Sequence, residues 1–241
     1  MKKKFFIELT FLILLGALTS LSLPPFNYFI INFLTFSLFF IFLIKKIELD
    51  KNKKIFFLYG WLFGFGYFVS NLYWISISLT FDQNFKFLIP FTVVLVPGFL
   101  ALFYALISYL FVILKPKKIL SSFFIFSLIF GIVEFIRGSI LTGFPWNLIA
   151  YSFSNQLEIL SITSIIGTYS FNLFCISLFT SPSIFILRDN KKEISVCIAF
   201  LVTTMSFYFF GSQNLEKFKK EQTKKLDYKI RILNSNISID R

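Results

Sequence analysis

The chain has 241 residues, of which 56% are hydrophobic and only 15% are charged, and its mean hydropathy is +0.78. A soluble domain of this length needs a charged surface around its core, so the composition excludes an ordinary soluble protein. The net charge is +12, and most of the lysines lie in short segments between apolar runs. Basic residues at such positions set the orientation of a protein in the membrane, so we expect no nucleic-acid partner. Because the sequence has no histidine, imidazole catalysis and histidine-ligated metals are excluded, and we expect neither a metal nor a cofactor.

Apolar runs along the chain are long enough to cross a hydrocarbon core of ~30 Å, so we expect an all-α polytopic membrane protein. The first run follows three lysines and resembles a secretory signal, but no clear cleavage site follows it, and we expect a retained helix. Pro97-Gly98 predicts a kink in the fourth run, whereas Gly167 and Pro182 predict an interruption of the sixth. The seven predicted spans cover residues 5–23, 28–44, 55–79, 87–114, 119–141, 159–187 and 194–210.

The basic residues predict the orientation of these spans. Most basic residues that flank the spans would lie on one side of the membrane. They occur in segments 2–4, 45–54, 115–118 and 188–192. The opposite short loops hold only Lys86, with Arg137 just inside a span. Basic loops stay in the cytoplasm, so we expect a cytoplasmic N-terminus and an extracytoplasmic C-terminal tail.

We expect residues 1–211 to form the transmembrane domain and residues 212–241 to form a separate tail. The tail starts with a polar stretch that is typical of a helical linker, and "YKIRILNSNISI" then alternates polar and apolar residues like a strand with one buried face. Because a lone strand is unstable, we interpret it as the first strand of a truncated α/β domain. The alternative is a disordered tail beside the membrane.

Glu134 and Arg137 form the most unusual motif, because ionisable residues within a span are costly and often mark a functional site. Their spacing places them on one helix face, where they can pair. The following "TGFPWN" cannot continue a helix, since Pro145 lacks an amide donor, and Trp146 suits the headgroup level. We therefore expect a re-entrant or interfacial loop above a cavity. The alternative is a charge pair that locks helix packing, followed by an ordinary turn.

The third predicted span, "GWLFGFGYFVSNLYWISISL", combines small residues with aromatic ones. Gly60, Gly64 and Ser70 have a spacing that favours close helix packing. Near its outer end, Asn71, Tyr73 and Trp74 are alternatively candidates for the mouth of a lipid groove. Elsewhere, we expect Glu8 in the first span to snorkel or to pair, and Cys175 and Cys197 to be small core residues.

"VEFIRGSILTGFPWNLIAYS" resembles the membrane segment of bacterial apolipoprotein N-acyltransferases, in which an acidic residue, Arg-Gly and "GFPW" followed by Tyr-Ser occur in this order. The glycine-rich third span resembles the corresponding span of that family. "LSLPPFNYFIINFLTFSLFFIFL" is similar to its first hairpin, and "KIRILNSNIS" resembles the opening strand of its nitrilase-like domain. The resemblance covers nearly the whole chain.

The resemblance implies a thiolate-dependent acyl transfer in the bacterial cytoplasmic (inner) membrane. The acyl donor would be a membrane phospholipid, and the acceptor would be the N-terminal cysteine amine of diacylglyceryl lipoproteins. In the family, a Glu-Lys-Cys set in the nitrilase-like domain performs the chemistry. Cys175 and Cys197 lie in spans instead, so we assign no catalytic residue and expect this chain to be inactive alone. The residues that we expect to shape a lipid platform are Glu134, Arg137, Gly143, Phe144, Pro145 and Trp146, together with Tyr73 and Trp74.

Two other functions remain open from the sequence. One is a non-catalytic membrane scaffold or remnant that needs a separate catalytic subunit. The other is a small transporter, which would require related halves with paired charges or broken helices in each. The sequence shows one such cluster and no internal repeat, which makes transport the least favoured reading.

Overall fold

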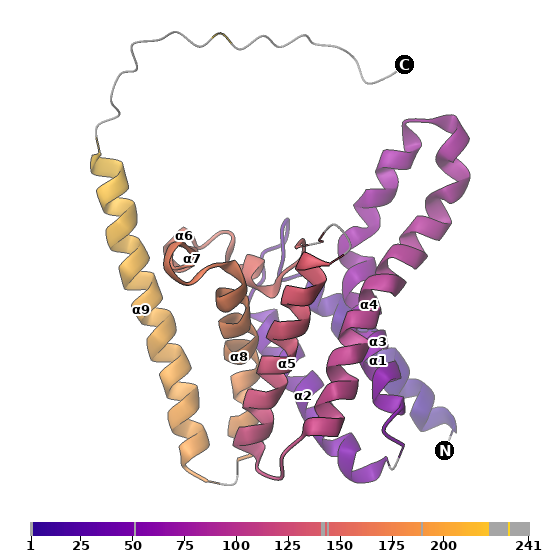
Figure 1. Cartoon of the computed structure of the whole chain (residues 1–241), viewed down its shortest axis with the longest axis horizontal. Helices are drawn as coiled ribbons and strands as arrows, with labels where there is room; N and C mark the ends of the chain where they lie inside the picture. Colours follow the sequence, from indigo (N-terminus) through magenta and orange to yellow (C-terminus); the bar gives the residue numbers. More distant parts are fainter. Residues whose placement is uncertain are drawn as a thin grey trace.

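The computed structural model describes residues 2–50, 52–140, 143, 145–188, 190–221 and 231. Within these ranges every regular element is a helix (Figure 1). The strand predicted near the C-terminus lies outside the described residues, apart from Arg231, and the same holds for Phe144.

The first hairpin consists of α1 (Lys2–Ser20) and α2 (Ile31–Leu49). The predicted first span extends to residue 23, but α1 ends at Ser20, because Pro24 and Pro25 cannot continue a helix. The Ser20 hydroxyl also donates to the carbonyl of Ala17 at 2.7 Å at this end. The second helix begins three residues later than predicted and continues beyond residue 44 to Leu49.

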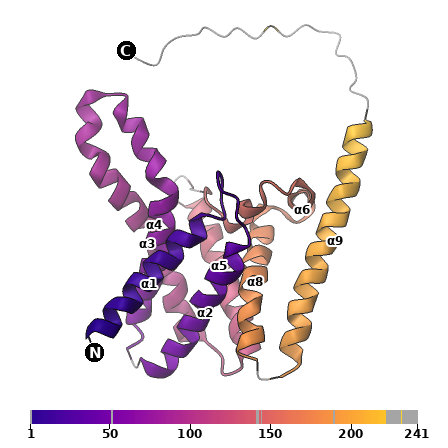
Figure 2. The same cartoon turned by 180° about the vertical axis from the view of Figure 1, so that it is seen from behind.

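The second hairpin extends beyond the rest of the bundle on the side away from α9 (Figures 1 and 2). It contains α3 (Ile55–Leu72), the 3₁₀ segments η1 (Tyr73–Thr80) and η2 (Gln83–Leu88), and α4 (Ile89–Leu114). The third predicted span thus changes from α-helix to 3₁₀-helix at Tyr73. Helix α4 stays continuous through Pro97.

The third part of the chain starts with α5 (Ile119–Ser139), which ends two residues before the predicted boundary because Ile140 is extended. The short elements η3 (Ile149–Phe153), α6 (Leu157–Leu160) and α7 (Thr163–Ile166) follow. The remaining helices are α8 (Thr168–Ile186) and α9 (Lys192–Lys220).

The interruption predicted within span 159–187 is confirmed at Gly167, and only the second part of the span is a long helix. Residues before Gly167 form two short helices, and the long helix α8 starts only at Thr168. The break falls at Gly167, whose φ of +78° is a conformation that favours glycine. Pro182, in contrast, lies inside α8 without ending it. At the other end, α9 runs past the predicted end at 210 and takes in the start of the predicted linker.

Five segments of the described chain are long and apolar enough to cross a membrane, and they correspond to the last five predicted spans. Helices α1 and α2 are 19 residues long, but each carries several charged residues, including Glu8 in α1 and Lys45 and Lys46 in α2. The five candidate spans are Ile55–Thr80, Gln83–Leu114, Ile119–Ser139, Thr168–Ile186 and Lys192–Lys220.

Aromatic side chains fill the core between α2, α3, α4 and α5. The rings of Phe39 and Phe63 stack with centroids 4.1 Å apart, and Phe130 lies edge-on to Tyr104 at 5.0 Å. The prediction of close packing at Gly60 is confirmed, since a Cβ there would meet Ser108 and the backbone of Tyr104. Large aromatic faces thus pack tightly where glycine lets the helix backbones approach.

Candidate functional site

Glu134 and Arg137, one helical turn apart on α5, form a doubly hydrogen-bonded ion pair. The Arg137 guanidinium donates from Nε to Glu134 Oε1 at 3.0 Å and from Nη2 to Oε2 at 2.6 Å. Both side chains are fully buried, and the guanidinium lies 5.4 Å from the ring centroid of Phe68 on α3. This parallel geometry is the strong form of an arginine–carboxylate pair, and it satisfies two charges that would be costly to bury separately.

The pair also holds the loop that follows α5. Arg137 Nη1 donates to the backbone carbonyl of Trp146 at 3.1 Å, and the Tyr67 hydroxyl of α3 donates to the carbonyl of Asn147 at 2.7 Å. Gly143 turns the loop with a φ of +75°, a conformation suited to glycine. Two adjacent carbonyls are therefore fixed from two different helices.

The segment after this loop is fixed from two more directions. The backbone amide of Ala150 in η3 donates to the side-chain oxygen of Asn172 on α8 at 2.9 Å. The hydroxyl of Ser154 donates to Asn27 Oδ1, in the turn between α1 and α2, at 3.0 Å. Figure 2 shows this turn at the end of the bundle that also carries α6. Segments far apart in the sequence thus meet at one end of the fold.

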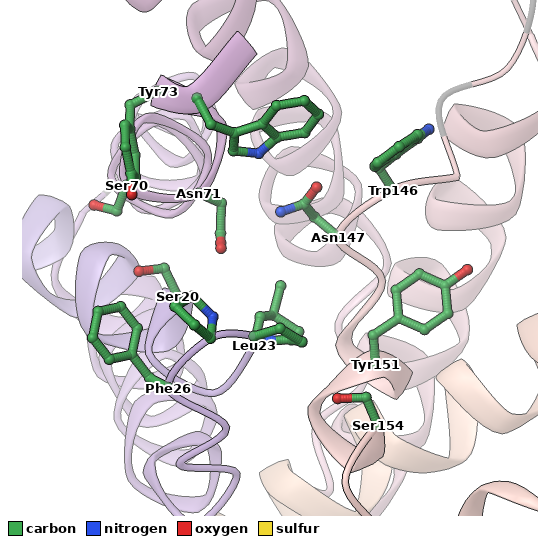
Figure 3. A pocket seen from close by; sticks show the side chains of 13 residues that line it. Ser20, Leu23, Phe26, Ser70, Asn71, Tyr73, Trp146, Asn147, Tyr151 and Ser154 are labelled. Carbon is green, nitrogen blue, oxygen red and sulfur yellow. The ribbon is translucent and has the colours of Figure 1, made fainter. Parts of the chain in front are cut away.

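A pocket of about 450 Å³ lies where these segments meet (Figure 3). One wall is the end of α3, the opposite wall is the segment from Trp146 to Ser154, and the turn after α1 closes the third side. The rings of Trp74 and Trp146 both line it and contact each other, tilted by 41° with centroids 5.7 Å apart. The lining residues are Ser20, Leu23, Pro24, Pro25, Phe26, Ser70, Asn71, Tyr73, Trp74, Trp146, Asn147, Tyr151 and Ser154.

No charged side chain lines this pocket among the residues that the structure describes. Its polar groups are hydroxyls and amides, and the rest of the lining consists of aromatic rings, prolines and Leu23. Burial raises the pKa of the Tyr151 phenol, so the hydroxyl stays protonated at neutral pH. Neutral donors and acceptors among apolar surfaces suit the ester and acyl parts of a lipid better than its phosphate.

The predicted site residues divide into two groups. Tyr73, Trp74 and Trp146 line the pocket, whereas Glu134 and Arg137 lie buried behind it and contact it through the Trp146 carbonyl. The buried position of Glu134 and Arg137 agrees with the alternative prediction of an ion pair that fixes helix packing. Gly143 and Pro145 belong to the loop but are absent from the lining, and Phe144 lies outside the described residues.

Sequence reasoning missed several lining residues. Asn147, Tyr151 and Ser154 follow the Pro-Trp break directly, and their polarity within an apolar stretch was an available signal. Ser20 and the turn with Phe26 carried no comparable signal, because only the fold brings them beside α3.

The cysteines lie away from this pocket. Cys175 is fully buried in α8. The Cys197 thiol of α9 donates a hydrogen bond to the backbone carbonyl of Ser181 at 3.2 Å. Their prediction as packing residues agrees with this placement. In the described parts of the chain, no group of three Cys, Asp or Glu residues could hold a metal ion.

The fold and the site define a multi-pass helical membrane protein with an uncharged, lipid-compatible pocket at one end of its bundle. Residues 15–180 match the family model described as the apolipoprotein N-acyltransferase N-terminal domain. The chain belongs to the apolipoprotein N-acyltransferase family, which confirms the resemblance inferred from its motifs.

Curated relatives carry the same family name. The apolipoprotein N-acyltransferase of Rhodopseudomonas palustris is 33% identical over 95% of this chain and 43% of its own length. That of Rickettsia prowazekii is 32% identical over 93% of this chain and 44% of the relative. That of Rhizobium etli is 32% identical over 78% of this chain and 36% of the relative. The chain thus spans less than half the length of these relatives.

Proposed function

We propose that this chain forms the membrane part of an enzyme that transfers an acyl chain from a membrane phospholipid to a lipoprotein. The acceptor is the amino group of the diacylglyceryl-modified N-terminal cysteine. Family membership supports the reaction class, and the relatives are named apolipoprotein N-acyltransferases. The observation that carries the proposal is the uncharged pocket lined by Trp74 and Trp146, because it suits the ester region of a lipid.

In this proposal the chain supplies a platform and not the reacting groups. The pocket lining described by the structure contains no Glu, Lys or Cys, so it offers no set for thiolate-based acyl transfer. The nucleophile and its base would come from another part of the protein or from a separate catalytic subunit. The buried Glu134–Arg137 pair would keep the Trp146 carbonyl, and with it this wall of the pocket, in position.

We further propose seven spans in the bacterial inner membrane, with α1 and α2 crossing beside the five apolar segments. The lysines of segments 2–4, 45–54, 115–118 and 188–192 would face the cytoplasm, and the pocket would open at the outer face. The charges in α1 and α2 support this, because Glu8 and Lys46 pair at 2.6 Å near the proposed cytoplasmic end. Lipids would then reach the pocket from the outer leaflet, past the exposed side chains of Phe26 and Tyr28.

A chimeric enzyme tests the proposal. Residues 1–211 of this chain would replace the matching part of the Rhodopseudomonas palustris protein, and acyl transfer from phospholipid to a diacylglyceryl peptide would be measured. We expect activity, and we expect Trp146→Ala to lower it on the order of tenfold, since an aromatic contact is worth up to about 1.5 kcal/mol.

The matched control is Phe209→Ala, which removes an exposed aromatic side chain from α9, away from the pocket. It should retain full activity, and both variants should insert into membranes normally. Equal activity of Trp146→Ala and Phe209→Ala would show that Trp146 does not contribute to the lipid platform. An inactive chimera beside an active parent enzyme would argue against the function itself.

A further inference from the structure

A second polar cluster lies at the other end of α1. Lys46 of α2 pairs with Glu8 of α1 at 2.6 Å and lies 3.7 Å from the carboxylate of Asp50. The Tyr59 hydroxyl of α3 donates to the same Asp50 carboxylate at 2.9 Å. These contacts join the first three helices, and they leave both carboxylates already paired.

Two hollows lie on either side of the Glu8–Lys46 pair. The first has a volume of about 440 Å³, and Phe5, Ile55 and Tyr59 supply its apolar wall. The second has a volume of about 310 Å³ and an almost wholly apolar wall, which includes Phe11 and Phe42. Such paired apolar hollows have the shape and chemistry to hold hydrocarbon chains.

Lysines surround these hollows. Lys4 lines the first and Lys45 lines the second, and both side chains are exposed. Neither has a carboxylate within ion-pair distance among the described residues. A third hollow of about 360 Å³ shares Asp50 and adds Lys53, Lys115 and Lys117. The three linings together hold six lysines and two carboxylates, so their charge complements an anion.

We propose that this cluster is a binding site for an anionic phospholipid of the lysine-rich membrane side. The headgroup phosphate lies between Lys4 and Lys45, and the acyl chains pack into the hollows beside Phe5 and Phe11. Lys4 and Ser20 are 16 residues apart on α1, so the lysine end of this site lies about 24 Å along the helix from the pocket at its other end. That distance exceeds half of the ~30 Å hydrocarbon core, so the two sites lie in opposite leaflets. The site is independent of the proposed acyl transfer.

Lipid binding to the purified chain in detergent tests the proposal. Native mass spectrometry would count bound phosphatidylglycerol and phosphatidylcholine for the unmodified chain and for Lys4→Ala/Lys45→Ala. We expect preferential retention of phosphatidylglycerol by the unmodified chain. The double variant should bind it more weakly, by about fivefold for each lysine removed.

The matched control is Lys191→Ala/Lys192→Ala. Both lysines are exposed; Lys191 directly precedes α9 and Lys192 is its first residue. The start of α9 lies at the same end of the bundle as the end of α2 (Figure 2). The control should bind phosphatidylglycerol like the unmodified chain. The proposal would be overturned if the unmodified chain bound phosphatidylglycerol and phosphatidylcholine equally. It would also be overturned if both double variants lost phosphatidylglycerol binding to the same extent. Displacement of the lipid by millimolar inorganic phosphate would also overturn it, because the site would then recognise a free anion.

Discussion

At the scale of single residues, the buried ion pair on α5 makes the most specific prediction. Arg137→Ala would leave the Glu134 carboxylate buried without its guanidinium and free the Trp146 carbonyl. Breaking a buried pair in this way costs about 3–5 kcal/mol. We expect the free energy of unfolding in detergent to fall by that amount.

Two further variants separate charge from shape at this position. Arg137→Lys keeps the charge, but its donors all sit on one nitrogen and cannot replace the planar fork that reaches both Glu134 oxygens and the Trp146 carbonyl, so its stability should be intermediate. Glu134→Leu combined with Arg137→Met removes both charges and should be less destabilising than Arg137→Ala alone. If Arg137→Ala had the free energy of unfolding of the unmodified chain, the ion pair would not stabilise the fold.

The pairing of Glu134 with Arg137 could be predicted from the sequence, because residues three apart lie on one helix face. The contact with the Trp146 carbonyl could not. It depends on a loop that reverses at Gly143, whose φ is +75°, and on the Tyr67 hydroxyl of a distant helix. Tertiary contacts of this kind leave no periodic signal.

At the scale of helices, the crossing of α1 and α3 depends on two glycines. A Cβ at Gly16 would collide with the Phe63 backbone, and a Cβ at Gly66 would collide with the backbone of Ile13. Because backbone atoms cannot move aside as side chains can, we expect Gly16→Val to destabilise the chain by about 3 kcal/mol or more. Thermal unfolding in detergent would measure this.

The matched control for that substitution is Gly98→Ala on α4. The nearest atom to a Cβ at Gly98 is the Trp61 ring at 3.7 Å, an ordinary contact. Its unfolding temperature should therefore stay close to that of the unmodified chain. Similar unfolding temperatures for Gly16→Val and the unmodified chain would refute the tight crossing.

The existence of most long helices followed from hydropathy, but their ends depended on local chemistry. The interruption at Gly167 could be predicted from the glycine itself, which adopts a positive φ there. The extension of α2 beyond residue 44 could not, because it places Lys46 beside Glu8 of another helix. The change to 3₁₀ geometry at Tyr73 also had no counterpart in the apolar pattern. Long apolar runs thus predict membrane helices well and their boundaries poorly.

At the scale of the whole molecule, the proposed orientation predicts which loops face outward. With Cys175 and Cys197 replaced by alanine, Asn84→Cys in η2 should react with an impermeant thiol reagent in intact cells. Asn52→Cys, between α2 and α3, should react only after the membrane is opened. Both asparagines are exposed, so access to the reagent depends on the side of the membrane. Labelling of Asn52→Cys in intact cells would reverse the orientation.

The most direct measurement for the central claim is photolabelling of the membrane-embedded chain with a diacyl phospholipid. Its photoreactive group would sit next to the ester, the part of the lipid that the uncharged pocket suits. We predict crosslinks to the segments around Asn71 to Trp74 and Trp146 to Ser154, reduced by Trp146→Ala and unchanged by Phe209→Ala. Uniform labelling of all lipid-facing helices, insensitive to Trp146→Ala, would contradict a lipid platform at this pocket.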